Sequence, residues 1–146
     1  MAAMSDYLEN KLIDALFRGQ AYTMPATVHV ALFTGAPTDS AGGTEVTGGS
    51  YARVAVSSSL ANWAGTQSAG STVVSNGNTG TTSNNNAVTF PAPTANWGVI
   101  THFALMDAAS AGNVLFYGAL NTSKTVNSGD AAPQFAAGAL SLQLDN

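Results

Sequence analysis

Short segments with a two-residue period occupy the sequence after Pro25, and they constrain the fold more than any other feature. Residues 99–106, 114–120 and 139–145 alternate as a β-strand does, and the last has the cleanest apolar and polar faces. Residues 27–34 carry apolar groups on both faces, which is typical of an interior strand. Turns of glycine, proline and asparagine separate the segments, and no strand–helix–strand alternation occurs. We therefore predict a mainly β protein, an antiparallel β-sandwich or jelly roll of about eight strands.

One segment near the N-terminus has the period of a helix instead. Its apolar stripe includes three leucines spaced four residues apart, Leu8, Leu12 and Leu16. Asp6 is the expected N-cap, because Glu9 follows three residues later as in a capping box, and Gly19 is placed to end the helix. We predict an amphipathic helix over residues 6–18. Its apolar stripe either covers the core of the β domain or docks on a neighbouring subunit.

The length of 146 residues favours a single domain, residues 1–146, in which the helix precedes a β-sandwich over residues 26–146. Two long loops, near residues 38–50 and 64–86, are rich in Gly, Ser, Thr and Asn. The second loop has little apolar area to bury, apart from a short strand signal at residues 73–74. We expect this loop either to be disordered in isolation or to become ordered on a partner.

Charged residues make up only 8% of the sequence, against about 25% in typical domains. Four basic residues and a net charge of −4 exclude an electrostatic footprint for nucleic acid and a polybasic membrane patch. No apolar run is long enough to span a membrane, and the N-terminus lacks signal-peptide features. We therefore expect synthesis in a cytosol, without nucleic-acid or membrane partners. Low charge suits a subunit that packs against other chains, but it also suits a β domain with Ser, Thr and Asn at its surface.

Candidate catalytic and metal-binding residues are few. The sequence has no cysteine, which excludes disulfides, thiolate catalysis and cysteine zinc sites. His29 and His102 each lie mid-strand among apolar residues, and we interpret both as structural histidines. The alternative is a metal site in which the two histidines meet Asp107 across a sheet, as in cupin-like barrels. No nucleophile, phosphate-binding or dinucleotide-binding motif occurs. We therefore expect no enzyme activity, no catalytic residue, and no bound metal or cofactor.

Two tryptophans remain as candidates for binding. Trp63 and Trp97 each follow an asparagine near the ends of predicted strands. They either close the ends of the sandwich core, contact a neighbouring subunit, or stack on sugar rings as in a carbohydrate-binding module.

Several stretches also resemble a known family. The most specific are GTEVTGGSYARV at residues 43–54 and WGVITHFA at residues 97–104. The others are AYTMPATVHVALFT at residues 21–34, VTFP at residues 88–91 and FYGA at residues 116–119. Together they resemble small virion proteins of tailed bacteriophages, which are often labelled tail fibre or tail protein. Some members look like the jelly-roll cement proteins that bind outside an HK97-type capsid.

The resemblance implies a structural virion protein with no catalytic residues. Its expected role is that of a cement or decoration protein on the capsid surface, made in the host bacterial cytoplasm and bridging capsomers. The expected partners are the phage major capsid protein and further copies of the chain, with a dimer favoured over a trimer. A tail fibre or tail accessory protein and a carbohydrate-binding module are the alternatives. The candidate partner contacts are Leu8, Leu12, Leu16, Trp63 and Trp97.

Overall fold

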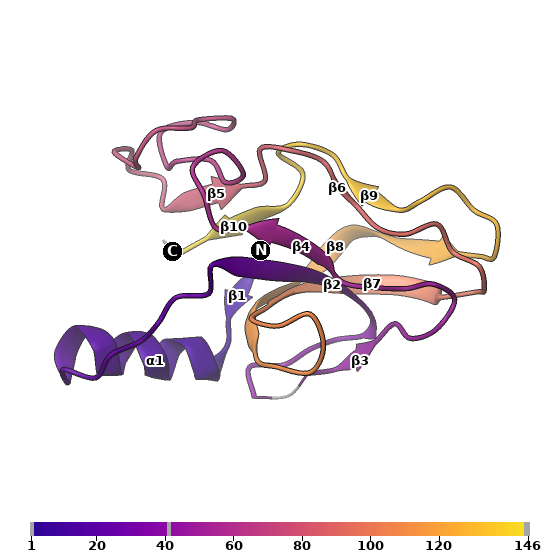
Figure 1. Ribbon diagram of the computed structural model, residues 1–146, viewed down its shortest axis with the longest axis horizontal. Helices are drawn as coiled ribbons and strands as arrows, with labels where there is room; N and C mark the ends of the chain where they lie inside the picture. The colour runs from indigo at the N-terminus through magenta and orange to yellow at the C-terminus, as the bar shows by residue number, and fades with distance from the viewer. Residues whose placement is uncertain (1, 41, 145–146) are drawn as a thin grey trace.

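An antiparallel sheet of six strands organises the chain in the computed structural model, which describes residues 2–40 and 42–144 (Figure 1). Its strands run in the order β1, β8, β7, β2, and the far edge of β2 pairs with β4 along its first half and with β3 along its second. The elements are β1 (Ala3–Met4), α1 (Asp6–Phe17), β2 (Thr27–Gly35), β3 (Thr44–Glu45), β4 (Val54–Ser57), β5 (Thr81–Ser83), β6 (Val88–Thr89), β7 (Gly98–Met106), β8 (Val114–Val126), β9 (Gln134–Phe135) and β10 (Ser141–Gln143).

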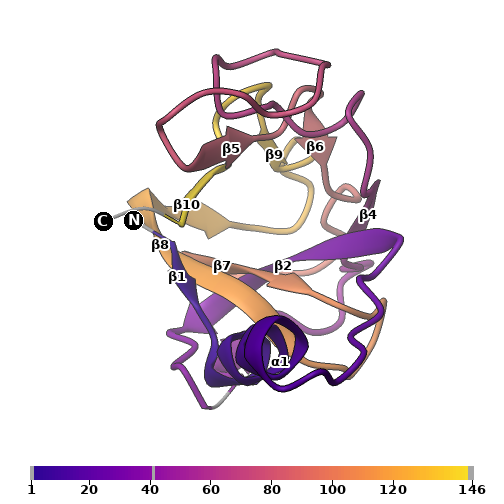
Figure 2. The same ribbon diagram turned by 90° about the vertical axis from the view of Figure 1, so that its left-hand side faces the viewer.

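A second layer of two short ribbons, β5–β10 and β6–β9, covers one face of this sheet (Figure 2). Residues paired across the ladder share a face, so Val30, Leu105 and Phe116 form one apolar row on β2, β7 and β8. The residues next to these ribbon strands that pack in the same core include Phe90, after β6, and Leu140, before β10, which are only 2% and 1% exposed. The prediction of a mainly β, antiparallel sandwich is therefore confirmed, with ten strands in the described part of the chain.

The other face of the sheet turns toward α1 (Figure 2). Alternation along β2 and β7 places a smaller apolar cluster there, formed by Ala31, Phe33, Ala104 and Met106. Both long strands are thus apolar on two faces, as expected for the interior strand at residues 27–34. The sequence signal at residues 139–145 becomes the short strand β10, and Asp145 lies outside the described residues.

The helix has nearly the predicted bounds, but its N-cap is Ser5 and the assignment of Asp6 as the cap is wrong. Ser5 still follows the extended path of β1, and its N–H donates to the carbonyl of Leu115 at 3.0 Å. Its hydroxyl then accepts from the N–H of Leu8 at 3.3 Å, which leaves Asp6 inside the first turn, where its charge favours the helix dipole. Gly19, with φ of +68°, follows the helix end as predicted.

The loop at residues 64–86 is held by hydrogen bonds within this chain. Asn84 makes the most buried of these bonds, with a side chain that is only 1% exposed. Its Nδ2 donates to the carbonyls of Asn86 and Ala136, both at 2.8 Å. The Asn84 Oδ1 accepts from the N–H of Leu140 at 2.8 Å, so one amide ties the loop to the strand that follows β9. The predicted strand at residues 73–74 is wrong: those valines are 59% and 72% exposed, outside any strand.

Candidate functional site

The two histidines do not assemble a metal site. Pairing places His29 beside Met106 and His102 beside Phe33, all on strands of the main sheet. His102 Nδ1 lies 2.8 Å from the hydroxyl of Thr101, whereas His29 Nδ1 is buried without a hydrogen-bond partner. Within residues 2–40 and 42–144, no three His, Asp or Glu side chains gather closely enough to hold a metal ion. No helix in that part is long and apolar enough to cross a membrane.

The charged residues of the GTEVTGGSYARV stretch form a structural network. Arg53, whose side chain is 7% exposed, donates from Nε and Nη2 to the two carboxylate oxygens of Glu45, at 2.8 and 2.7 Å. Its Nη1 donates to the carbonyls of Ala108 and Ala111, both at 2.7 Å, in the turn between β7 and β8. Ala111 has φ of +50°, an unusual value for alanine, and the bond from Arg53 holds that turn in place. The hydrogen bonds with Glu45 raise the pKa of Arg53 above its ordinary value.

Tyr51 extends this network into the core. Its hydroxyl donates to Glu45 at 3.0 Å and accepts from the N–H of Leu32 at 2.9 Å. Burial raises the pKa of Tyr51, and the neighbouring carboxylate adds to the rise. The network therefore joins β2, β3 and the β7–β8 turn, which is a structural role for residues that the resemblance singled out.

Trp97 joins the two most specific stretches of the sequence to each other. Its ring is 5% exposed, meets Tyr51 edge-on at 5.3 Å, and donates from Nε1 to the carbonyl of Gly49 at 2.9 Å. A Cβ at Gly49 would lie 2.9 Å from that Nε1, so only glycine allows this approach. Trp97 thus belongs to the protein's own core and offers no open face to a partner or a sugar. Trp63 is half-buried and packs against the core, and its backbone forms an isolated antiparallel β-bridge with Asn84.

The helix leucines have three different environments. Leu8 is buried at 7% exposure, Leu12 is half-buried, and Leu16 is 73% exposed. Ile13 and Phe17 are also exposed, at 50% and 80%. Because α1 runs outward from β1, its C-terminal end extends beyond the sheet (Figure 1). We call Ile13, Leu16 and Phe17 the helix-end patch.

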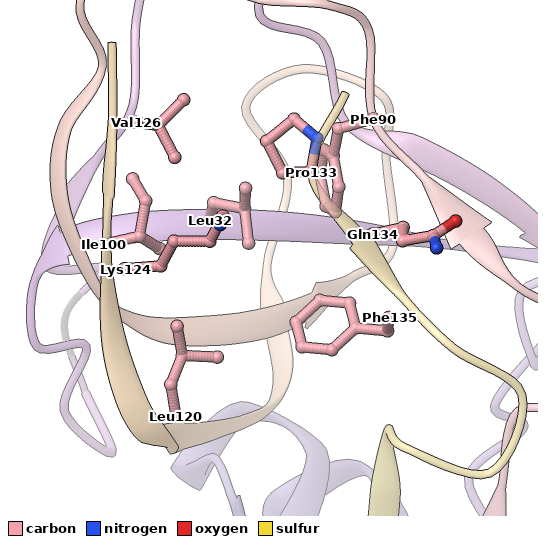
Figure 3. Close-up of a pocket in the computed structure, with 9 residues that line it drawn as sticks. All are labelled: Leu32, Phe90, Ile100, Leu120, Lys124, Val126, Pro133, Gln134 and Phe135. Atoms are coloured by element: carbon pink, nitrogen blue, oxygen red, sulfur yellow. The ribbon is translucent and has the colours of Figure 1, made fainter. Parts of the chain in front are cut away.

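A small apolar cavity lies between the main sheet and the β6–β9 ribbon (Figure 3). Its volume is about 60 Å³, well below the roughly 300–1,000 Å³ of a ligand pocket. It opens toward a groove of about 640 Å³ beside β8 and β10. Four residues line both spaces: Leu120, Lys124, Gln134 and Phe135.

The described residues thus form an antiparallel β-sandwich in which the specific motifs serve the fold and an apolar helix end projects from it. A family model described as Podophage GP4 fiber I protein gp80 matches residues 3–143. This match shows that the chain is a structural virion protein of a tailed bacteriophage, as the resemblance implied. The chain belongs to the family of the Podophage GP4 fiber I protein gp80. No curated protein matches the chain.

Proposed function

We propose that the chain is a non-enzymatic fibre subunit that is anchored to a neighbouring virion protein through the helix-end patch. The family description supports a fibre role, and the uncovered end of α1 carries the proposal. The first leucine of the apolar stripe is buried on the protein's own body, whereas Leu16 and Phe17 project into solvent. An amphipathic helix normally buries such a stripe, so the exposed half is best explained by a partner.

The chemistry of the patch fits a protein interface. Full burial of a large apolar side chain contributes about 1.5–3 kcal/mol, so these three residues can supply a hot spot. Asp14 and Arg18 form an exposed ion pair at 3.3 Å beside the patch. An exposed pair of this kind adds little affinity, but it gives the patch a polar rim.

The test is incorporation into particles. Leu16→Asp and Phe17→Asp should each leave the melting temperature nearly unchanged, because both side chains are exposed, and should strongly reduce the amount of protein recovered with purified virions. Val73→Asp and Val74→Asp are matched controls, since these valines are comparably exposed on a loop of the same chain. The proposal is wrong if the helix and loop variants are incorporated equally well.

A cement or decoration role on the capsid surface is the second candidate. It is supported by the low charge, which avoids repulsion between crowded copies. In this role the partner is the major capsid protein, and copies pair as dimers. Quantitative gel analysis of virions separates the candidates: a cement protein occurs in copy number comparable to the capsid protein, whereas a fibre subunit occurs in far fewer copies.

A further inference from the structure

One edge of the main sheet is open over most of its length. β1 pairs with β8 only at Phe116 and Tyr117, and the outer edge of β8 beyond this point has no strand beside it in the described residues. On the inner side, the register to β7 jumps from the pair Ala119–His102 to the pair Lys124–Ile100. Residues 120–123 of β8 therefore form a bulge opposite Thr101 and have no ladder partner on either side.

A second open edge borders the same groove. β10 pairs with β5 alone, and Ser141 and Gln143 of β10 line the groove of about 640 Å³ together with residues 119–122 of β8. Figure 2 shows β10 above the β8 end of the main sheet. The groove thus separates two strand edges, each with unpaired backbone N–H and C=O groups. An extended main chain is the structure that satisfies such groups in series.

The residues that line the groove indicate what kind of segment fits it. The floor is apolar, with Phe103, Leu120 and Phe135, and the rim carries uncharged polar groups such as Asn121 and Gln134. A segment that alternates apolar and polar side chains would place its apolar set on this floor, because side chains of a strand alternate in direction.

Lys124 adds a charge to this description. Its side chain reaches over the small cavity that adjoins the groove (Figure 3), and it is the one charged residue lining either space. It makes no ion pair among the described residues, in which the two ion pairs involve Arg18 and Arg53. An occupant with a carboxylate near Lys124 is therefore favoured over a basic one.

We propose that this groove accepts an extended segment of another virion polypeptide, alternating in polarity and neutral or acidic, which adds a strand between β8 and β10. The added strand would join the six-stranded sheet to the β5–β10 ribbon. This surface is separate from the helix-end patch, so the proposal holds for a fibre subunit and for a cement protein alike.

Cross-linking in assembled particles tests the occupant. A photoreactive benzophenone side chain replaces Thr122, and the same group at Asn78, which is exposed on the long loop, is the control. We expect the Thr122 position to give a cross-link to one contiguous, alternating segment of another virion chain. Adducts no stronger than the control, or adducts to nucleic acid or to scattered surface sites, would overturn the proposal.

Backbone substitution tests the strand geometry. Thr122→Pro removes an N–H that no described strand uses and should lower incorporation into virions about tenfold, whereas Thr122→Val keeps the N–H and should be incorporated normally. If the proline variant unfolds, hydrogen exchange of the unmodified protein decides. The amides of residues 120–123 should exchange fast in the free protein and slowly in the virion, and equal exchange in both states would contradict strand addition. Leu16→Asp leaves the groove intact, so failure at the helix end is distinguishable from failure here.

Discussion

At the scale of single residues, the main finding is that two of the few charged side chains, Glu45 and Arg53, form a partly buried pair. The pair is bidentate. Glu45 also accepts a hydrogen bond from Tyr51, and Arg53 also donates to two backbone carbonyls. The desolvation cost of such a pair is offset only when its remaining donors and acceptors are hydrogen-bonded. The stretch EVTGGSYAR is therefore explained by the fold, and its spacing alone did not reveal that its glutamate and arginine meet.

The network predicts a specific loss of stability at high pH. Burial raises the pKa of Tyr51 above its ordinary value of about 10, so the unfolded chain releases this proton first as the pH rises. The contribution of Tyr51 is complete below about pH 10 and is lost as the pH rises toward its folded value. Tyr51→Phe should show a smaller fall in unfolding free energy between pH 9 and 12, as measured by chemical denaturation. It should also be less stable at pH 7, by about 1–3 kcal/mol, because the buried N–H of Leu32 loses its acceptor.

Tyr117→Phe provides the comparison for this experiment. The hydrogen bond to Asp39 raises the pKa of Tyr117 to about 12, so this variant should also flatten the alkaline profile. However, the Tyr117 hydroxyl serves no buried N–H, and phenylalanine keeps the half-buried ring that packs against the cluster of Phe33 and Met106, so the replacement should cost little at pH 7. Parallel pH profiles for the wild type and Tyr51→Phe would contradict the assigned role of the network.

At the scale of elements, periodicity identified the long elements but only some of the short strands. The helix, β2 and β7 were predictable because each repeats its pattern over nine residues or more. β1 and β3 have two residues each, and their extended state depends on the partners β8 and β2 rather than on local sequence. The apolar stripe of α1 was also predictable, but its spacing could not tell which leucines meet the sheet and which pass beyond it.

Order in the loop at residues 64–86 could not be predicted from composition, because it depends on hydrogen bonds to distant parts of the chain, of which those of the buried Asn84 amide are central. Asn84→Asp replaces the donating amide group with an oxygen that faces two carbonyls, so we expect a loss of about 2–5 kcal/mol in unfolding free energy. Amides of β10 should exchange faster in this variant, since Asn84 also accepts from Leu140. Asn78→Asp, on the exposed part of the loop, is the matched control and should change neither quantity. Equal stability of the two variants would contradict a central role for Asn84.

At the scale of the whole molecule, the two proposed contact surfaces share a property that the low charge dictates. Both present mainly apolar side chains; the groove adds uncharged polar groups and Lys124, and the helix-end patch is bordered by the exposed Asp14–Arg18 pair. Apolar burial is insensitive to ionic screening, whereas exposed charge pairs weaken over a Debye length of about 10 Å at 0.1 M salt and about 3 Å at 1 M. The protein should therefore stay bound to purified virions when sodium chloride is raised from about 0.1 to about 1 M. Lys124→Glu should weaken binding modestly at low salt and less at high salt, because repulsion from an acidic occupant is screened. Release of the wild-type protein by 1 M salt would mean that charges outside these two surfaces hold it on the particle.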